Sequence, residues 1–292
     1  MRYHYSKDTV YIKGEFRAAS TGVAGGLKCV STLLNHTVPK DFDHEDPAGY
    51  IRGLVAAKGY GEDAFGLLTA VWMQNLCVMR YDYVTAFVTA GVTNPSPDPM
   101  KPHTINIIVT SDEGMTDACL LETIRVTTEA KAHALRLLGR EFTGTTSDAV
   151  ITACSGGVKH IYAGTFTELG RRVYDAVLHG VLASLDRHEG RVVRSGPSFF
   201  IYSRFEGDHW VEWQKEGCPY YPCHFPGQAC DFCYCPFYPC HDTELGEMVE
   251  GSSGGQVWAC TDCTLLHLSH VAAYLKAHPD ATLDELKALR NL

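Results

Sequence analysis

The 292-residue sequence lacks any run of 18 apolar residues, and its first residues lack the apolar core of a secretory signal. The first absence predicts that no helix spans a membrane and that no membrane partner is needed. The second makes the cytoplasm the expected location. There is also no phosphate-binding Gly-Lys-Ser/Thr loop, no dinucleotide fingerprint, no Gly-x-Ser-x-Gly elbow and no His-Glu-x-x-His helix. These four gaps exclude the commonest nucleotide-binding, serine-hydrolase and metalloprotease patterns.

Basic residues are scarce in the last third of the chain. From Pro197 to the end there are 5 Lys and Arg against 13 Asp and Glu, whereas the first 196 residues carry 20 against 21. A nucleic-acid-binding surface needs cations to neutralise phosphates. We therefore predict no nucleic-acid partner, even though cysteine-rich segments often have one.

Cysteines divide the sequence in the same place. Four of the twelve are scattered through the first two-thirds, mostly inside apolar runs, and are expected to be buried. The other eight lie between Cys218 and Cys263. The polar link Arg191-Val-Val-Arg-Ser-Gly-Pro197 falls between the two compositions. The predicted domains are therefore residues 1–195 and 196–292.

Hydrophobic patterns in the first part alternate between strands and long helices. The predicted strands are Thr9–Phe16, Leu27–Val38, Phe65–Met73, Tyr83–Val92, His103–Ser111 and Ala149–Cys154, and the predicted helices are 46–57, 117–138 and 166–186. Such an alternation predicts an α/β or α+β fold, with a mixed sheet and packed helices. Ser198–Tyr202 also resembles a strand, and a last helix is expected at about Leu283–Leu289.

The helix beginning near Thr116 carries a lysine where an apolar residue is expected. On a helical wheel, Leu121, Ile124, Thr128, Ala132, Leu135 and Leu138 share an arc of about 120°, and Lys131 lies within it. An ammonium group there must reach solvent along its own stem or find a carboxylate such as Asp148 or Asp117. By contrast, Glu122, Arg125 and Glu129 form a stripe that we expect on the surface.

Three further polar positions have both structural and catalytic interpretations. Thr165 and Glu168 have the spacing of a capping box, but the same helix start can also present amides to an oxyanion. Asp148 follows the hydroxyl-rich turn Thr143-Gly-Thr-Thr-Ser147, so it is either a turn residue or a base for water. His36 suits acid-base work, although a lone histidine is often structural.

An ordered set of short motifs resembles the adenosylcobinamide amidohydrolase family over roughly residues 10 to 185. The matching segments, in order, are Ser20-Thr-Gly-Val-Ala-Gly-Gly-Leu27, Asn35-His-Thr-Val-Pro39, Thr89-Ala-Gly-Val92, Thr104-Ile-Asn-Ile-Ile108, Thr116-Asp-Ala118, Glu129-Ala-Lys-Ala132, Thr143-Gly-Thr145, Ser147-Asp148-Ala149, Tyr162-Ala-Gly-Thr165 and Glu168-Leu-Gly170. Each motif alone is unspecific. One departure is His103, where the family pattern has glycine.

The resemblance implies cleavage of the amide that joins aminopropanol to the corrin ring, so the implied partner is a small corrinoid substrate. From the chemistry of that reaction we assign Asp148 as the base for water, Lys131 as the group that tunes it or stabilises the oxyanion, and His36 as the acid for the leaving amine. The residues expected to bind substrate are Ser20, Thr21, Gly22, Gly25, Gly26, Asn106, Thr116, Asp117, Thr145, Ser147, Thr165 and Glu168.

The eight clustered cysteines have metal-ligand spacing. Two Cys-x-x-Cys pairs, Cys230/Cys233 and Cys260/Cys263, accompany Cys218, Cys223, Cys235 and Cys240. Since no secretory signal is expected, metal is favoured over disulfides. Eight thiolates suffice for two structural zinc ions, or for an iron-sulfur cluster and a zinc.

This segment is similar to the cysteine-rich small domain described as zinc-finger-like. The match includes Cys218-Pro-Tyr-Tyr-Pro-Cys-His224, Phe232-Cys-Tyr-Cys-Pro-Phe-Tyr238 and Cys260-Thr-Asp-Cys-Thr-Leu-Leu-His267. The usual Cys-Gly-Gly is displaced, because His follows Cys240 and a Gly-Gly occurs only at 254–255. Cys240 can therefore be replaced as a ligand by His224, His241, His267 or His270.

Two other functions remain open at this point. The chain can be a corrinoid-binding or delivery protein that has lost its chemistry, although polar residues are retained in all the motifs. Alternatively, the metal domain can be the functional part, as a redox or interaction module.

Overall fold

The computed structural model describes residues 1–6, 8–92, 104–202, 210–212, 218, 220–233, 235–251, 255–278 and 280–292. Two compact units are present, one formed by Tyr5–Trp213 and the other by Met1–His4 with Gln214–Leu292. The predicted domain boundary after residue 195 precedes two strands that pair within the sheet of the larger unit.

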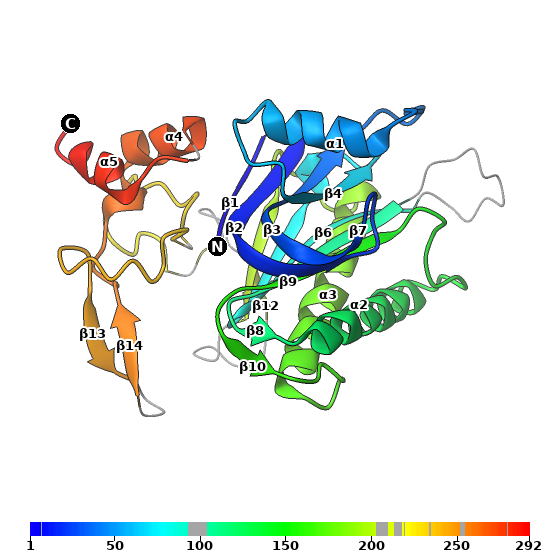
Figure 1. The fold of residues 1–292 in the computed structure, drawn as a ribbon. Helices are drawn as coiled ribbons and strands as arrows, with labels where there is room; N and C mark the ends of the chain where they lie inside the picture. Colours follow the sequence, from blue (N-terminus) through cyan, green and yellow to red (C-terminus); the bar gives the residue numbers. More distant parts are fainter. Residues whose placement is uncertain are drawn as a thin grey trace. The chain divides into compact units, whose positions relative to one another are not determined.

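The larger unit is built from strands and three long helices (Figure 1). Its elements are β2 (Thr9–Ser20), β3 (Gly26–Thr37), α1 (Pro47–Ala56), β4 (Ala64–Thr69), η1 (Met73–Asn75), β5 (Cys77–Tyr81), β6 (Val84–Gly91), β7 (Thr104–Ser111), β8 (Gly114–Met115), α2 (Asp117–Leu137), β9 (Ala149–Cys154), β10 (Val158–His160), α3 (Glu168–His188), β11 (Ser198–Tyr202) and β12 (Trp210–Glu212). β1 (Arg2–Tyr5) precedes them.

The main sheet is mixed and runs in the order β12-β11-β5-β6-β7-β9-β2-β3-β4. The pairs β3–β4, β7–β9 and β5–β11 are parallel, and the other neighbours are antiparallel. α2 and α3 pack on one face and α1 lies on the other (Figure 1). The predicted mixed sheet with packed helices is therefore confirmed.

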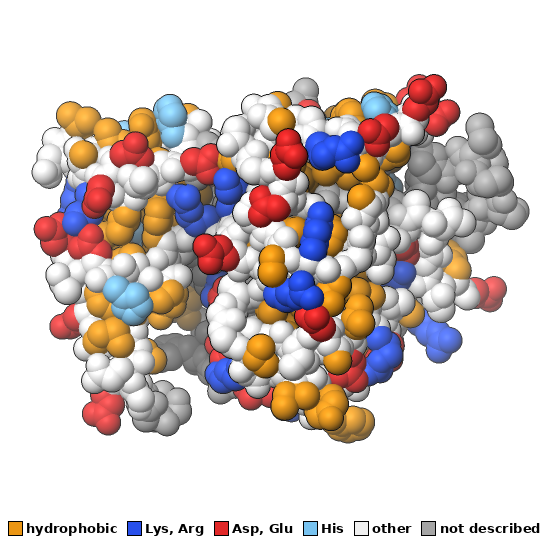
Figure 2. All heavy atoms as spheres, viewed as in Figure 1, with side chains coloured by type: hydrophobic (Ala, Val, Ile, Leu, Met, Phe, Trp, Pro, Cys, Tyr) orange, Lys and Arg blue, Asp and Glu red, His pale blue; other side chains and the backbone are white. Residues whose placement is uncertain are grey.

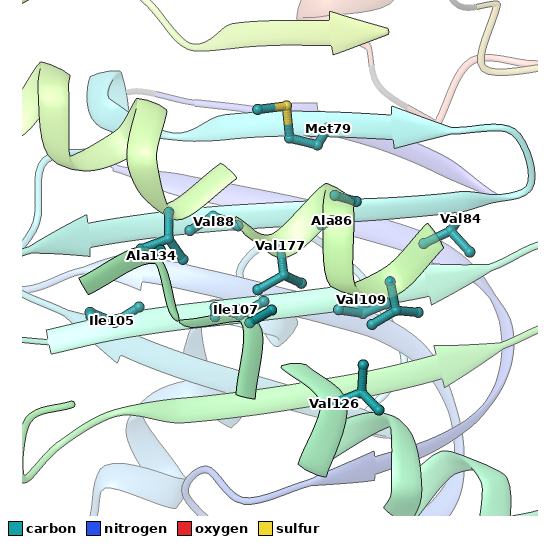
Figure 3. Close-up of a cluster of buried hydrophobic side chains, with 14 of the residues drawn as sticks. Met79, Val84, Ala86, Val88, Ile105, Ile107, Val109, Val126, Ala134 and Val177 are labelled. Carbon is teal, nitrogen blue, oxygen red and sulfur yellow. The ribbon is translucent and has the colours of Figure 1, made fainter. Parts of the chain in front are cut away.

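The principal core lies between the sheet and the pair α2 and α3. Figure 3 shows Ile105, Ile107 and Val109 of β7 beside Val84, Ala86 and Val88 of β6, with Val126 and Val177 contributed by the helices. Alternate residues of each strand face this core because successive side chains point to opposite faces. A separate cluster of Tyr11, Leu34, Ile51, Val55 and Tyr60 holds α1 on the other face.

The buried face of α2 differs from the predicted arc. Its buried residues are Cys119, Leu120, Thr123, Val126, Thr127, Ala130, Lys131, Ala134 and Leu135, whereas Leu121 is 55% exposed. Small residues and threonines fill much of this face, because the helix lies close against both α3 and β9. A wheel weighted toward large apolar residues therefore placed Leu121 on the buried face wrongly, although it placed Lys131 and Leu135 there correctly.

From Cys218 onward, the described residues of the smaller unit include a strand pair and short helices around a separate core. β13 (Glu247–Glu250) pairs with β14 (Gln256–Ala259), and η2 (Leu265–His267), α4 (Ser269–Ala277) and α5 (Leu283–Ala288) follow. Leu265, Leu266, Val271, Leu275 and Leu286 form the centre of that core. Arg2 belongs to this unit, where it donates to the carbonyl of Ala281 at 2.9 Å.

Charges of both signs are interspersed on the surface. On the face drawn in Figure 2, blue lysine and arginine side chains alternate with red aspartate and glutamate, and the described residues form no continuous basic stripe there. Among the described residues, no helix is both long enough and apolar enough to cross a membrane.

Candidate active site

Lys131 and Asp148 form a buried ion pair at the start of β9. The ammonium of Lys131 donates to Asp148 Oδ2 at 2.5 Å, and the two side chains are 8% and 9% exposed. The predicted alternative that Lys131 finds a carboxylate partner is thus confirmed, and the partner is Asp148. Asp117 pairs instead with Arg17 at 2.7 Å on the surface.

Asp148 also ties the preceding turn to strand β7. Its carboxylate accepts from the backbone N–H of Thr145 at 3.0 Å, from the Thr145 hydroxyl at 2.5 Å and from the N–H of Ile105 at 2.9 Å. An added Cβ at Gly144 would lie 2.5 Å from both Asp148 Oδ2 and Lys131 Nζ, so a larger residue there would force these two side chains to shift. The turn is therefore closed tightly over the ion pair.

The glycine-rich loop after β2 reaches the same end of β9. The Thr21 hydroxyl accepts from the N–H of Val150 at 3.0 Å, and the N–H of Thr21 donates to the carbonyl of Val150 at 2.9 Å. Within the loop, the N–H of Gly22 donates to the Ser20 hydroxyl at 3.0 Å. An added Cβ at Gly25 would lie 2.3 Å from the carbonyl oxygen of Ser20, so the turn requires glycine at that position.

Asn106 lies in a buried polar network that links β7 to β4, the edge strand of the same sheet. Its amide nitrogen donates to Asn35 Oδ1 at 3.0 Å and to the carbonyl of Leu68 at 2.8 Å, while Asn35 donates to the Thr89 hydroxyl at 2.8 Å. Thr104 donates to both Asn106 Oδ1 and the carbonyl of Ser147. Because Leu68 belongs to β4, the network brings the sheet edge back toward β7, and the structure places Asn106, at 0% exposure, in the interior.

His36 lies elsewhere, beneath α1. Its Nδ1 shares a hydrogen bond with the Thr9 hydroxyl at 2.7 Å and its Nε2 shares one with the Tyr50 hydroxyl at 3.0 Å. Burial lowers the pKa of His36, opposed by the charge of Asp8. The structure does not bring His36 into hydrogen-bond contact with Lys131 or Asp148.

Two further predicted substrate-binding residues, Thr116 and Asp117, lie at the other end of α2. Thr116 caps that helix by accepting from the N–H of Cys119 at 3.1 Å. Since a helix rises about 1.5 Å per residue, Asp117 and Lys131 are ~21 Å apart along the axis. The predicted site residues therefore do not form one cluster, because Thr116 and Asp117 lie far along α2 from Lys131 and His36 makes no hydrogen bond to the Lys131–Asp148 pair.

The predicted capping box at the start of α3 is wrong. Thr167, not Thr165, caps the helix by accepting from the N–H of Gly170 at 3.0 Å, and Glu168 is the first helical residue. Glu168 pairs with buried Arg172 at 2.7 Å. Thr165 instead lines a surface hollow with Glu129, Arg171 and Tyr174.

Sequence reasoning missed Arg17 and Thr104 as neighbours of the predicted residues. Arg17 makes a two-pronged contact with Asp117, from Nε at 2.8 Å and Nη2 at 2.7 Å. The only available signal was a charged residue inside the apolar strand β2. Thr104 was within a quoted motif, but nothing in the sequence indicated its contact with Ser147.

The clustered cysteines of the smaller unit fall into two sets. Burial raises the pKa of Cys233, and the neighbouring thiols Cys223, Cys230 and Cys218 raise it further. Burial raises the pKa of Cys235 to about 12, opposed by a hydrogen bond from the Phe237 backbone and reinforced by Cys263, Cys260 and Cys240. We call Cys218, Cys223, Cys230 and Cys233 the first thiol group, and Cys235, Cys240, Cys260 and Cys263 the second.

The donor set of each group fits a soft metal, because four sulfur atoms are the usual ligands of structural zinc. Within the described ranges, however, no three histidine, cysteine, aspartate or glutamate side chains already converge closely enough to hold a metal ion. All eight cysteines are free thiols. The structure therefore brings the eight thiols into two groups, but the sulfur atoms of each group do not surround a common point.

The histidines considered as substitute ligands have other contacts. His267 donates from Nδ1 to the carbonyl of Ala229 at 2.8 Å, and His270 donates from Nε2 to that of Leu289 at 2.8 Å. The ring of His224 is tilted by 38° against that of His267, with ring centres 4.5 Å apart, and His241 lies against Trp258.

Relatives of known name cover the larger unit. A protein named adenosylcobinamide amidohydrolase from Methanosarcina mazei is 42% identical over 196 residues, which are 64% of this chain and 98% of the relative. A protein of the same name from Halobacterium salinarum is 34% identical over 59% of this chain and 81% of its own length. An uncharacterised protein from Methanocaldococcus jannaschii is 50% identical over 83 residues, 26% of this chain and 70% of its own length.

Two family models match successive parts of the chain. The model described as cysteine-rich small domain matches residues 209–290. The model described as adenosylcobinamide amidohydrolase matches residues 2–192, well over half of the sequence. Asp148 and its partners Ile105, Lys131 and Thr145 lie within that match. The chain therefore belongs to the adenosylcobinamide amidohydrolase family.

Proposed function

We propose that this chain hydrolyses the amide bond between aminopropanol and the corrin ring of adenosylcobinamide, releasing adenosylcobyric acid and 1-amino-2-propanol. The reaction lets salvaged cobinamide re-enter cobamide synthesis. Support comes from the family match over residues 2–192 and from two relatives with that name. The corrinoid is then a small-molecule substrate.

One observation carries the position of the active site. Three segments contact the Asp148 carboxylate: the strand with Ile105, the helix with Lys131 and the turn with Thr145. The glycine-rich loop joins them two residues further on, where Thr21 contacts Val150. Packing alone needs no buried ion pair at such a junction, and replacing buried pairs with apolar residues is often neutral. We therefore assign catalysis to the Lys131–Asp148 pair.

The proposed chemistry is a general-base hydrolysis. Asp148 takes a proton from water as the water oxygen bonds to the amide carbon, and the carbonyl electron pair moves onto oxygen. Lys131 stabilises that oxyanion, together with those N–H groups of the Ser20–Gly26 loop that are not already bonded within the loop or to Val150. The C–N bond then breaks, and the proton held by Asp148 passes to the leaving amine. One of the four donors to Asp148 must turn away to admit the water.

Steady-state turnover of adenosylcobinamide tests the assignment. Asp148→Asn is expected to lower kcat by about 10²- to 10⁴-fold, the usual contribution of a general base. Asp186→Asn is the matched control, since Asp186 is an exposed carboxylate of α3 paired with Arg191 and has no predicted role at the site, and it should keep most turnover. Thermal unfolding of each variant separates catalytic loss from misfolding. Near-normal turnover in folded Asp148→Asn would contradict the assignment.

His36 remains a predicted acid without a contact to the pair. His36→Gln tests it separately, because glutamine can still bond to Thr9 and Tyr50. Loss of kcat with unchanged stability would support the acid role, and retained kcat would assign proton delivery to Asp148 alone.

We further propose that the cysteine-rich smaller unit is a structural module with two zinc ions, one in each thiol group. Zinc thiolates suit the reducing cytoplasm, which is the proposed location. Metal analysis of the purified chain should then find two zinc ions in a colourless protein. Iron and sulfide with broad visible absorption would support an iron-sulfur cluster instead.

A further inference from the structure

Gln228 is a buried polar residue in the middle of the first thiol group. It is 1% exposed and lies in the segment that joins Cys223 to Cys230. A fully buried glutamine requires partners for its amide oxygen and for both of its N–H groups. The contacts of that amide therefore indicate what the residue does.

The local sequence explains how Gln228 turns inward. Phe225-Pro-Gly-Gln228 closes a tight turn in which the N–H of Gln228 donates to the carbonyl of Phe225 at 3.2 Å. Proline at the second position and glycine at the third, with φ of +84° at Gly227, are the residues that a type II turn favours. The turn brings the side chain of Gln228 back toward the cysteines that flank it.

Each polar atom of the Gln228 amide has a partner. Oε1 accepts from the N–H of His224 at 2.9 Å and from the N–H of Phe225 at 3.2 Å. Nε2 donates to the sulfur of Cys223 at 3.0 Å and to the sulfur of Cys230 at 3.6 Å. The orientation is unambiguous, because the two backbone groups can only donate and must face the oxygen.

We propose that Gln228 is a positioning residue for metal binding by the first thiol group. Its two N–H groups hold Cys223 and Cys230 at a fixed separation and withdraw negative charge from their sulfurs. Such outer-shell hydrogen bonds orient ligands and tune the bound metal. The inference rests on the proposed zinc sites, and it concerns the first group alone.

The second thiol group provides an internal comparison. Within the part of the chain that the structure describes, no side-chain amide donates to the sulfurs of Cys235, Cys240, Cys260 or Cys263; Cys235 receives a backbone hydrogen bond from Phe237. A change at Gln228 should therefore act on one group and spare the other.

Cobalt(II) titration of the full-length chain tests the proposal, because cobalt bound to thiolates absorbs in the near ultraviolet. Gln228→Leu should weaken cobalt binding at one site by about 10- to 100-fold, the usual effect of removing an outer-shell partner. Binding at the other site should be unchanged, which also reports that the unit is folded. Gln256→Leu, at an exposed glutamine of β14, is the matched control.

A second pair of chains isolates the first site. In a Cys260→Ser background, the remaining sulfur-to-cobalt band should shift when Gln228→Leu is added, since two N–H groups no longer draw charge from the sulfurs. Gln228→Glu should weaken binding further, because a carboxylate oxygen then faces them. Unchanged affinity and band position in Gln228→Leu, or equal weakening of both sites, would overturn the proposal. If the wild-type chain bound no cobalt, the proposed metal sites themselves would be refuted. That result would be independent of whether the chain turns over adenosylcobinamide.

Discussion

Lys131 Nζ lies 2.5 Å from Asp148 Oδ2, which joins the middle of α2 to the first turn before β9 through two side chains that are less than one-tenth exposed. The contact spans 17 residues of sequence and secures the turn that carries Thr145. It also gives the larger unit a charged pair whose stability and chemistry can be tested separately.

Removing the lysine should destabilise the fold strongly. Lys131→Met leaves a buried carboxylate with its hydrogen bonds from Thr145 and Ile105 but without a counter-charge, so we expect a loss of about 3–5 kcal/mol in the free energy of unfolding. Lys159→Met is the control, because its side chain is 65% exposed beside Glu113 and the loss of an exposed ion pair should change stability far less. Urea denaturation measures both, and similar losses for the two variants would contradict the account.

The polar network around Asn106 yields a matched pair of substitutions on one strand. Thr89 and Thr85 are both buried in β6, but Thr89 accepts from Asn35, whereas the Thr85 hydroxyl has no hydrogen-bond partner among the described residues. Thr89→Val should cost about 1–3 kcal/mol, since it leaves a buried N–H of Asn35 unpaired. Thr85→Val should be neutral or stabilising. Thermal unfolding of the two variants should separate them, and a larger loss at Thr85 would refute the role of the network.

Cysteine reactivity should distinguish the four thiols of the larger unit. Burial raises the pKa of Cys77 to about 12 and that of Cys119 to about 11, and Cys154 is raised by burial as well. Cys29 is exposed. Because the thiolate is the reactive form, iodoacetamide at pH 8 should label Cys29 well before these three in the native protein. Peptide mass spectrometry checks the order, and early labelling of Cys77 would contradict the burial.

Stability should fall on acidification through buried histidines. Burial lowers the pKa of His36 and of His179 below the ordinary value of 6.5. As pH falls below about 6.5, the unfolded chain takes up protons that the folded chain does not yet bind, so the free energy of unfolding decreases until the lower folded values are reached. His36→Gln should reduce the slope of stability against pH in that window. A slope that the variant leaves unchanged would show that His36 does not titrate in this way.

Local pattern was sufficient for the regular elements with clear boundaries. Ala149–Cys154 was predicted with its observed bounds, because an apolar run follows a hydroxyl-rich turn and ends at Ser-Gly-Gly. Helix α1 was located by Asp46 and Pro47, and Asp46 does accept from the N–H of Gly49. β8 and β10 were missed, since strands of two and three residues have no periodicity to detect. His103, the departure from the family pattern, lies outside the described residues.

Site residues were predictable from the sequence only where their polarity differed from that of the surrounding residues. Lys131 stood out as a charge on an apolar helix face, and its partner Asp148 was one of two nearby acids. The contact between Asn35 and Asn106 spans 71 residues and depends on the sheet bending back so that β3 approaches β7. No periodic sequence pattern encodes that bend. The cap of α3 was misplaced because Thr165 and Thr167 both precede Glu168, and the capping-box spacing favoured the wrong threonine. The role of Gln228 required knowing that the turn at Pro226 faces the sulfurs.

The most direct test of the central claim is a mass-resolved turnover assay of the intact protein with adenosylcobinamide in water enriched in oxygen-18. The account predicts free 1-amino-2-propanol and adenosylcobyric acid whose new carboxyl group carries one solvent-derived oxygen. Bound corrinoid recovered unchanged, with no amine released, would contradict hydrolysis and favour a corrinoid-delivery role.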